Sequence, residues 1–477
     1  MEDVPVPRPE LTAEAPATGV SPSGAPIPDD VTALCRTLWS AGHAAYVVGG
    51  SLRDLLLGLE PRDWDLTTDA RPEEIQALFP GSIYENRFGT VAVRRDGVEY
   101  EITTFRRDHD YADHRRPHRV EFGTSIEDDL ARRDFTVNAI AWGARPVPGA
   151  PPPADFDPAP VDPYGGAADV AARRLRAVGD PLERFEEDAL RMIRAVRLAA
   201  ALDFTIDDET LAAIGAKADL ARHLSGERIA YELTRLLQTS RPSIGLRVME
   251  QTGLLAVVAP PLADQIGIPQ NKVPGEDLWA HVLRAVDAVP VDRPTVRLAA
   301  LLHDVGKPRT MSQEGFPAHD VVGATVAREF LEKLHAPRSV QDRVTFLIRQ
   351  HMFSYEPAWT DAAVRRFMGK IGEAGDRALE DLFELREADN VGSGLPRETG
   401  LEELRRRVTE QLEANVPLTR ADLAIDGNDL MAELGLEPGP ALGRLLDQLL
   451  DRVIVDSDLN DRPTLLMLAQ GMLAERS

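Results

Sequence analysis

The chain has 477 residues, and because single hydrophobic cores stop growing near roughly 250 residues, its length predicts several domains. Its hydrophobic content of 43% and charged content of 28% are ordinary for globular proteins, and no apolar run reaches the roughly 18 residues that a membrane span needs. A formal net charge of −24 argues against nucleic-acid binding by the chain as a whole, since phosphate contacts require clustered Lys and Arg.

The N-terminal residues predict a disordered extension and no export signal. The opening MEDVPVPRPE carries acids and prolines where a secretory signal has a basic start and an apolar stretch, so we expect a cytoplasmic protein. Residues 1–28 are rich in Pro, Ala, Ser and Gly without apolar periodicity, which predicts disorder. The only cysteine, Cys35, excludes an internal disulfide and has the helical spacing of a core residue.

The next segment predicts a mixed sheet with flanking helices. A helix is expected after Asp29 and Asp30, ending at Gly42, followed by strands in AAYVV, DWDLTT, TVAVRR and VEYEITTF. A proline-rich stretch over 144–166 ends this pattern, and beyond it amphipathic segments of 3.6-residue period predict an almost entirely helical body. The fold class predicted is therefore α+β.

A glycine pair follows the first predicted strand in VVGGSLRDLLLG. Backbone amides at a turn that leads into a helix bind phosphate oxygens well, because the first amides of a helix lack partners within the helix. Gly49 and Gly50 are therefore candidates to hold a triphosphate, with Arg53 as a charged clamp. A glycine pair alone is a weak signal, since tight turns use it for conformational reasons.

Two aspartates, Asp63 and Asp65, follow about ten residues later. Alternation along a strand would place both carboxylates on one face, where they repel each other unless a cation lies between them. We expect Mg²⁺ here, and a two-ion site of this kind supports in-line displacement of pyrophosphate. Glu101 on a neighbouring strand is the candidate third carboxylate, with Glu99 as the alternative.

Arginines concentrate in the first 200 residues, close to these motifs. In the expected helix over 187–197, Asp188 and Arg191 are three residues apart and should share a face. A carboxylate acceptor beside a guanidinium donor matches the Watson–Crick edges of both cytosine and adenine, while guanine and uracil have the opposite polarity. Arg194 continues the series, and Arg197 has turned about half a revolution, toward phosphate or a neighbouring acid.

The helical body contains histidines and aspartates in an order typical of a metal site. The six candidate ligands are His281, His303, Asp304, His319, His351 and Asp389. Imidazoles and carboxylates from several helices can hold one or two divalent transition metals. The arrangement resembles an HD-type metal phosphohydrolase domain.

The motifs together resemble the bacterial and eukaryotic family of CCA-adding tRNA nucleotidyltransferases. The resemblance rests on GGSLRDLLLG, RDWDLTTDA, ITTFR, ARRDFTVNA, EDALRMIRAVR and SGERI, over residues 29 to about 275, and on NRFGTVAV (86–93), which favours this family over the related poly(A) polymerases. It implies a polymerase-β-like head followed by an all-α neck, body and tail. It also implies that Arg132, Arg133 and Asp134 lie near the ribose and triphosphate, and that Asp188 and Arg191 select the base.

The predicted domains are a catalytic head (29–165), a neck and body with the base-selecting helix and an RNA-binding surface (166–275), an HD-type domain (276–400) and a helical tail (401–477). We expect an enzyme that adds C, C and A to tRNA from CTP and ATP, with an added phosphohydrolase activity. Four alternatives stay open: addition of only A or only CC, a poly(A) polymerase, a phosphohydrolase with a nucleotide-sensing head, and a nucleic-acid-binding module without catalysis. The oligomeric state is also open.

Overall fold

The computed structural model describes residues 27–84, 89–109, 119–123, 125–146, 158–270, 272–372, 375 and 377–474. Three of the sequence predictions lie partly outside this range. They are the disordered extension, of which only residues 27 and 28 are described, residues 86–88 of the NRFGTVAV phrase, and residues 147–157 of the proline-rich stretch.

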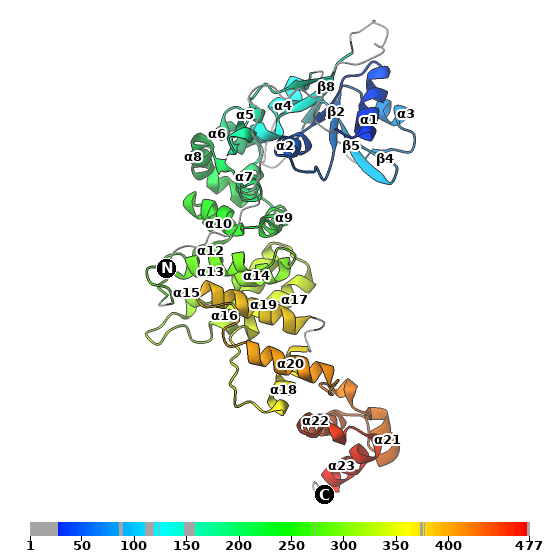
Figure 1. Ribbon diagram of the computed structural model, residues 1–477, viewed down its shortest axis with the longest axis vertical. Coiled ribbons are helices and arrows are strands. Elements are labelled where there is room, and N and C mark those ends of the chain that lie inside the picture. The colour runs from blue at the N-terminus through cyan, green and yellow to red at the C-terminus, as the bar shows by residue number, and fades with distance from the viewer. Residues whose placement is uncertain are drawn as a thin grey trace. The chain divides into compact units, whose positions relative to one another are not determined.

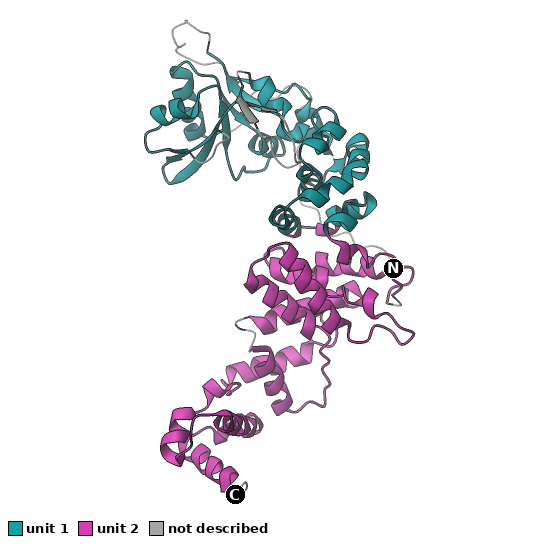
Figure 2. Ribbon diagram, turned by 180° about the vertical axis from the view of Figure 1, so that it is seen from behind, with its two compact units in different colours: residues 1–236, 244–258 teal, residues 237–243, 259–477 magenta. Residues whose placement is uncertain are grey.

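The chain forms two compact units (Figure 2). Unit 1 consists of Met1–Leu236 and Ile244–Val258, and unit 2 consists of Leu237–Ser243 and Ala259–Ser477. Strands β1 to β11 lie in unit 1, and the elements of unit 2 among the described residues are helices (Figure 1). The predicted α+β class, with strands first and helices after them, is confirmed.

The main sheet of unit 1 has seven strands in the order β3-β4-β5-β2-β1-β8-β9. Its strands are β1 (Ala45–Val48), β2 (Asp65–Thr68), β3 (Ile83–Tyr84), β4 (Thr90–Arg95), β5 (Val98–Thr104), β8 (Ala141–Ala144) and β9 (Ala159–Val161). The pair β2 and β5 is parallel, and the other neighbours are antiparallel, so the sheet is mixed as predicted. Two small sheets pair β6 (Arg106–His109) with β7 (Arg119–Phe122) and β10 (Arg174–Leu175) with β11 (Thr205–Ile206).

The core of unit 1 surrounds β1, an apolar interior strand of the sheet. All four residues of β1 are buried, as expected of a strand covered on both faces. On one side Tyr46 and Val48 pack with Phe105 and with Ile126 and Leu130 of α4. Ser125 starts α4 by accepting a hydrogen bond from the Asp128 amide, which fixes where the helix meets the sheet.

The helices up to Val258 flank this sheet or follow it in the chain. They are α1 (Asp29–Ser40), α2 (Gly50–Leu56), α3 (Pro72–Leu78), α4 (Ile126–Ala131), α5 (Gly166–Ala171), α6 (Pro181–Glu187), α7 (Leu190–Leu202), α8 (Asp208–Lys217), α9 (Gly226–Leu237), α10 (Pro242–Gln251) and α11 (Leu254–Val258). Helix α1 buries Cys35 with its apolar face, and burial raises the pKa of this thiol to about 12, so it behaves as a core residue.

Unit 2 is built from packed helix pairs. Its helices are α12 (Pro260–Ala263), α13 (Leu278–Ala288), α14 (Pro294–Leu302), α15 (Lys307–Thr310), α16 (His319–Lys333), α17 (Arg338–Gln350), α18 (Asp361–Gly372), α19 (Ala378–Gly392), α20 (Glu402–Glu413), α21 (Gly427–Leu434), α22 (Pro440–Val455) and α23 (Arg462–Ala474). Helix α13 packs on α19, which brings distant parts of the chain together, and α16 packs on the helix that follows it, α17. The last three helices share a separate leucine-rich core. Among the described residues, no helix combines the length and apolarity that a bilayer span requires.

Candidate nucleotidyl-transfer site and metal centre

The glycine turn leaves the sheet at the end of β1. Gly49 has φ 83°, a left-handed conformation that glycine adopts without strain, and α2 begins at Gly50. A Cβ on Gly49 would lie 2.9 Å from Nη1 of Arg133 and 3.8 Å from Oδ2 of Asp65. The turn therefore lies directly beside a guanidinium and a candidate metal-binding carboxylate.

The candidate carboxylates lie next to this turn, but only one of the aspartates is in the strand. Asp65 is the first residue of β2, whereas Asp63 precedes the strand, so the prediction that strand alternation aligns the pair was wrong. The reason is that β1 pairs Val48 with Asp65 and then turns away at Gly49, which leaves residues 63 and 64 without that neighbour.

The parallel strand β5 brings the third candidate opposite Asp65. Its residue Glu101 is the register partner of Asp65, while Glu99 forms an ion pair with Arg94 at 2.7 Å. Desolvation raises the pKa of the Asp65 carboxyl; Arg133 opposes this and Asp63 adds to it. A cation beside Asp65 would offset both the desolvation of its charge and the repulsion from Asp63.

Three arginines near the glycine turn are held in place by acidic and amide side chains. Arg132 and Arg133 both bind Asp129, at 2.7 and 3.4 Å, and the Asp129 side chain has no exposed surface. Burial alone would raise the pKa of Asp129, but these two guanidinium groups hold it below its ordinary value. Arg53 donates to Asp54 at 2.9 Å and to Oδ1 of Asn138 at 2.7 Å.

Asp134 is engaged by α7. Arg194 donates to one carboxylate oxygen of Asp134 through Nε and Nη2, at 2.9 and 2.7 Å. Although burial opposes it, this contact lowers the pKa of Asp134 well below the ordinary range. Arg197, on the same helix, binds an acid, Glu232, at 2.5 Å.

The expected continuous helix over 187–197 is interrupted at Asp188. Helix α6 ends at Glu187, Asp188 is extended (φ −145°, ψ 104°), and α7 begins at Leu190. The Asp188 carboxylate accepts from the Leu190 amide at 3.0 Å, which starts the new helix, and from Nη2 of Arg228 at 2.7 Å. The sequence pattern missed this because an aspartate three residues before an arginine fits a helix face and a helix cap equally well.

Arg191 is held in the first turn of α7. Its guanidinium donates to Glu187 at 2.5 Å and to the backbone oxygens of Arg184 and Arg132, at 3.1 and 2.9 Å. The Asp188 and Arg191 side chains are thus each fixed by neighbouring groups at the start of α7.

A second site is formed by five helices of unit 2. The six predicted ligands are all buried: His281, His303, Asp304, His319, His351 and Asp389. His281 and Asp389 come from α13 and α19, His303 and Asp304 follow α14, His319 begins α16, and His351 directly follows α17. Their candidate ligand atoms form two groups: His281, His303 and Asp389 in one, and Asp304, His319 and His351 in the other.

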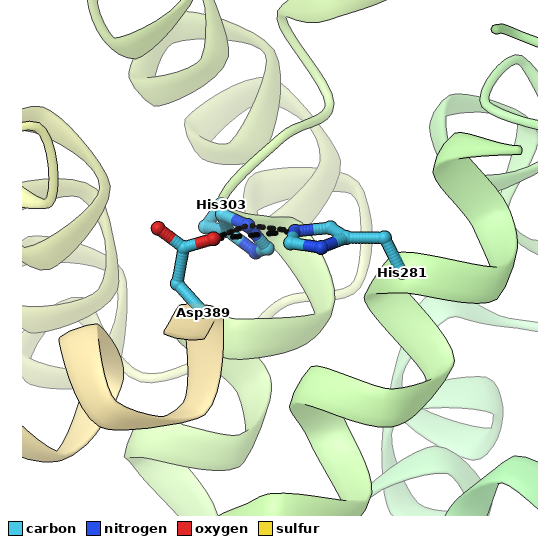
Figure 3. Close-up of side chains that lie close together, drawn as sticks. All are labelled: His281, His303 and Asp389. Atoms are coloured by element: carbon cyan, nitrogen blue, oxygen red, sulfur yellow. Dashed lines mark hydrogen bonds and ion pairs between the residues drawn. The ribbon is translucent and has the colours of Figure 1, made fainter. Parts of the chain in front are cut away.

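The first group is drawn in Figure 3, where the side chains of His281, His303 and Asp389 converge from separate helices. The Nε2 atoms of His281 and His303 are 3.1 Å apart, and Oδ1 of Asp389 is 3.4 Å from Nε2 of His281. Asp304 connects the two groups. Its Oδ2 is 3.1 Å from His303 and 3.3 Å from His281, and its Oδ1 is 3.5 Å from His319 and 3.9 Å from His351.

The hydrogen bonds of three imidazoles prepare them to bind metal. The Nδ1 atoms of His303, His319 and His351 contact backbone oxygens at 2.7, 2.8 and 2.6 Å. A carbonyl oxygen only accepts, so Nδ1 carries the proton and, in the neutral ring, Nε2 presents its lone pair to the centre. Oδ1 of Asp304 is buried without a hydrogen-bond partner among the described residues. The donor set therefore fits divalent cations.

The protonation states of the four histidines depend on their burial and on their distance from Asp304. Burial lowers the pKa of His351 to about 4 and also lowers the pKa of His281 and His319, so these rings are neutral at pH 7. Burial opposes a charge on His303 too, but the adjacent Asp304 raises its pKa overall. Lys307 binds Asp304 at 2.6 Å, and Lys272 binds Asp389 at 3.3 Å.

Several partners of the predicted residues were not anticipated from the sequence. They are Asp129, Asn138, Glu187, Arg228, Glu232, Lys272 and Lys307. Asn138, Glu187 and Arg228 lie within the quoted motifs, so their position offered a signal. Asp129 and Lys307 are three or four residues from their partners, a spacing that permits a contact without establishing it. Glu232 and Lys272 contact residues far along the chain, which sequence spacing does not encode.

The comparisons with known proteins cover both sites. Family models match residues 45–176 (poly A polymerase head domain), 203–266 (probable RNA and SrmB-binding site of polymerase A) and 262–393 (HD domain). Proteins of these domain types use divalent metal ions. Similar proteins include the CCA-adding enzymes of Geobacillus kaustophilus, 34% identical over 90% of this chain and 93% of the relative, and Levilactobacillus brevis, 34% identical over 91% and 95%.

Solved structures show the same similarity. The crystal structure of the Bacillus stearothermophilus CCA-adding enzyme in complex with CTP has 30% sequence identity and a TM-score of 0.67, covering 93% of this chain and 97% of that one. The Thermotoga maritima CCA-adding enzyme complexed with tRNA has a TM-score of 0.56 at 18% identity, covering 94% and 96%, and shows a shared fold.

Proposed function

Because the chain belongs to the family of CCA-adding enzymes, we propose that it adds C, C and A to the 3′ end of tRNA from CTP and ATP, releasing pyrophosphate at each step. The observation that carries this proposal is the meeting of the glycine turn, Asp65 and Arg133 within one end of the sheet. Addition of C, C and A is favoured over A-only or CC-only addition and over poly(A) synthesis by the full-length similarity to CCA-adding enzymes.

The metal-binding part of this proposal involves three carboxylates. Asp63, Asp65 and Glu101 would hold Mg²⁺, which suits a set of oxygen ligands. When bound, Mg²⁺ would supply activation of the attacking hydroxyl and neutralisation of charge on the leaving pyrophosphate. The raised pKa of Asp65 supports the assignment, because a carboxylate that is costly to charge gains most from a cation.

The protein groups would position the nucleotide. The turn at Gly49 and Gly50, with Arg53, would bind the triphosphate. Arg132, Arg133 and Asp134 would lie near the ribose and triphosphate of the nucleotide. Arg194 and Arg197 would hold α7 in place through their acidic partners. Asp188 would accept from the exocyclic amine of cytosine or adenine, and Arg191 would donate to the ring nitrogen. A carboxylate has about four acceptor positions, so the bonds of Asp188 to Leu190 and Arg228 leave capacity for a base.

The test is extension of three tRNAs that end before CCA, after C and after CC, supplied with CTP and ATP separately and together. The proposal expects CTP to extend the first two and ATP to extend only the third, by one residue. Repeated addition of A would indicate a poly(A) polymerase, and extension of only one substrate would indicate a partial-activity enzyme. The variant Asp65→Asn is the inactive control.

The buried centre supports a second activity, hydrolysis of phosphate esters with divalent transition metals. The observation that favours it is the pair of ligand groups joined by Asp304, whose imidazoles and carboxylates would hold divalent ions; such ions would supply an activated water and neutralise phosphate charge. Hydrolysis of a phosphomonoester and of a 2′,3′-cyclic phosphate with Mn²⁺ or Co²⁺, lost in His303→Ala, is the test. A metal-loaded protein that hydrolyses neither compound would refute it.

The domain limits and location are parts of the same proposal. We assign the catalytic head to 29–165, the neck and body to 166–275, the HD domain to 276–400 and the tail to 401–477. A cytoplasmic location is proposed because tRNA maturation supplies the substrate there.

A further inference from the structure

Asn138 connects two parts of the nucleotidyl-transfer site through its side-chain amide. It ends the short 3₁₀ helix Thr136–Asn138. Its Oδ1 accepts from Nη1 of Arg53 at 2.7 Å, and its Nδ2 donates to Oδ1 of Asp134 at 3.1 Å. Its backbone oxygen accepts from Arg133 at 3.3 Å. One small amide thus contacts a guanidinium on one side and a carboxylate on the other.

The two partners of this amide belong to the two halves of the site. Arg53 lies on α2, one turn after Gly49, where the triphosphate is proposed to bind. Asp134 is bound by Arg194 of α7, the helix that carries Arg191. Hydrogen bonds therefore run from Arg53 through Asn138 and Asp134 to α7. The side chains of Arg53 and Asp134 are only 12% and 10% exposed, so water screens these bonds weakly.

Asparagine suits this place for a chemical reason. Its amide has an acceptor end for the guanidinium and a donor end for the carboxylate. Aspartate would keep the acceptor for Arg53 but would place a second carboxylate against Asp134, and alanine would remove both bonds. Arg53 also binds Asp54, so loss of Asn138 would leave the charge of Arg53 in place and remove part of its orientation.

We propose that Asn138 is a positioning residue for nucleotide addition. Its amide oxygen orients the Arg53 guanidinium toward the triphosphate, and its amide nitrogen fixes the Asp134 carboxylate that binds α7. The phosphate-binding and base-selecting groups therefore keep their relative positions. The inference rests on the proposed function of Arg53 as a phosphate ligand, and it adds a residue that acts through Arg53 and Asp134 without touching the nucleotide.

The experiment compares wild type with Asn138→Ala, Asn138→Asp, Arg53→Ala and the double variant Arg53→Ala with Asn138→Ala. The measurements are KM and kcat for CTP on tRNA lacking CCA and for ATP on tRNA ending in CC, together with inhibition by inorganic tripolyphosphate, which has no base or ribose. Asn138→Ala should raise both KM values and the tripolyphosphate inhibition constant about tenfold, the effect of losing a hydrogen bond to a charged group, with little change in kcat.

The variants separate the two contacts of the amide. The double variant should bind tripolyphosphate no more weakly than Arg53→Ala, because Asn138 acts on phosphate only through Arg53. Asn138→Asp should keep tripolyphosphate binding within about threefold of wild type but lower the preference for CTP over UTP. The control is Asn428→Ala in α21, which removes an exposed asparagine bonded to Asp426 and should change none of these values.

Three results would overturn the inference. The first is additive losses of tripolyphosphate affinity in the double variant. The second is a lower melting temperature of Asn138→Ala with unchanged KM and inhibition constants. The third is wild-type tripolyphosphate affinity in Arg53→Ala. The proposed function fails separately: a wild type that does not extend tRNA refutes CCA addition, while a weaker tripolyphosphate affinity in Asn138→Ala would still support positioning of Arg53.

Discussion

Acid should destabilise the metal-free protein through His351. This imidazole is 1% exposed, and burial lowers its pKa from 6.5 to about 4. Between these pH values the unfolded chain holds a proton that the folded chain lacks, so the free energy of unfolding falls as the pH falls through this window. From the two pKa values, His351 alone should cost about 2 kcal/mol of stability between pH 7.5 and pH 5.

The assay is hydrogen exchange of α14 and α17 amides in chelator at both pH values, corrected for the intrinsic exchange rates. The opening free energy should fall between pH 7.5 and pH 5 in both proteins. The fall should be about 2 kcal/mol smaller in His351→Gln than in wild type. His303 has a raised pKa and so contributes stability below pH 6.5 that is lost at higher pH, but it is present in both proteins and largely cancels in the difference. The exposed His335→Gln is the matched control. Equal pH dependence in wild type and His351→Gln would show that His351 is charged or solvated in the fold.

Three further predictions concern the two sites. Asp65→Asn should reduce tRNA extension to below a few percent of wild type while tRNA binding, measured by filter retention, persists; clear residual extension would remove Asp65 from the metal site. Asp188→Ala should lower incorporation of CTP and ATP and reduce the preference for them over UTP and GTP about tenfold in single-nucleotide addition. An unchanged ratio of CTP to UTP incorporation would contradict base selection by Asp188. His303→Ala with Asp304→Ala should abolish Co²⁺ binding, measured by its absorption spectrum, and leave tRNA extension within about twofold; lost extension in a folded double variant would show that the sites are coupled.

Much of the metal centre was predictable from the sequence. His303 and Asp304 are adjacent at the end of an apolar helix, and the other histidines and Asp389 follow in a recognisable order. The pairing within the centre was not predictable, because it depends on α13 packing against α19 and α16 against α17. Asp304 connects the two groups because its two oxygens face different helix pairs.

The nucleotidyl-transfer site divides in the same way. The glycine pair and the strand patterns together predicted Asp65 and Glu101 as candidates, and the β-sheet register makes them direct partners. The position of Asp63 outside β2 follows from where β1 turns away, which a single strand's sequence does not contain. The break at Asp188 depends on its bonds to Leu190 and Arg228, the second of them forty residues along the chain.

The sequence by itself determined the order of strands and helices, the α+β class and the types of residue available for chemistry, because periodicity and turn residues act over short stretches of chain. Only the tertiary structure decided which charged groups neutralise one another. The contacts of Arg53 with Asn138 and of Arg194 with Asp134 join elements far apart in the chain, and the local bond between Asn138 and Asp134 links the two. Burial strengthens such contacts and fixes their geometry, and burial is a property of the packed fold.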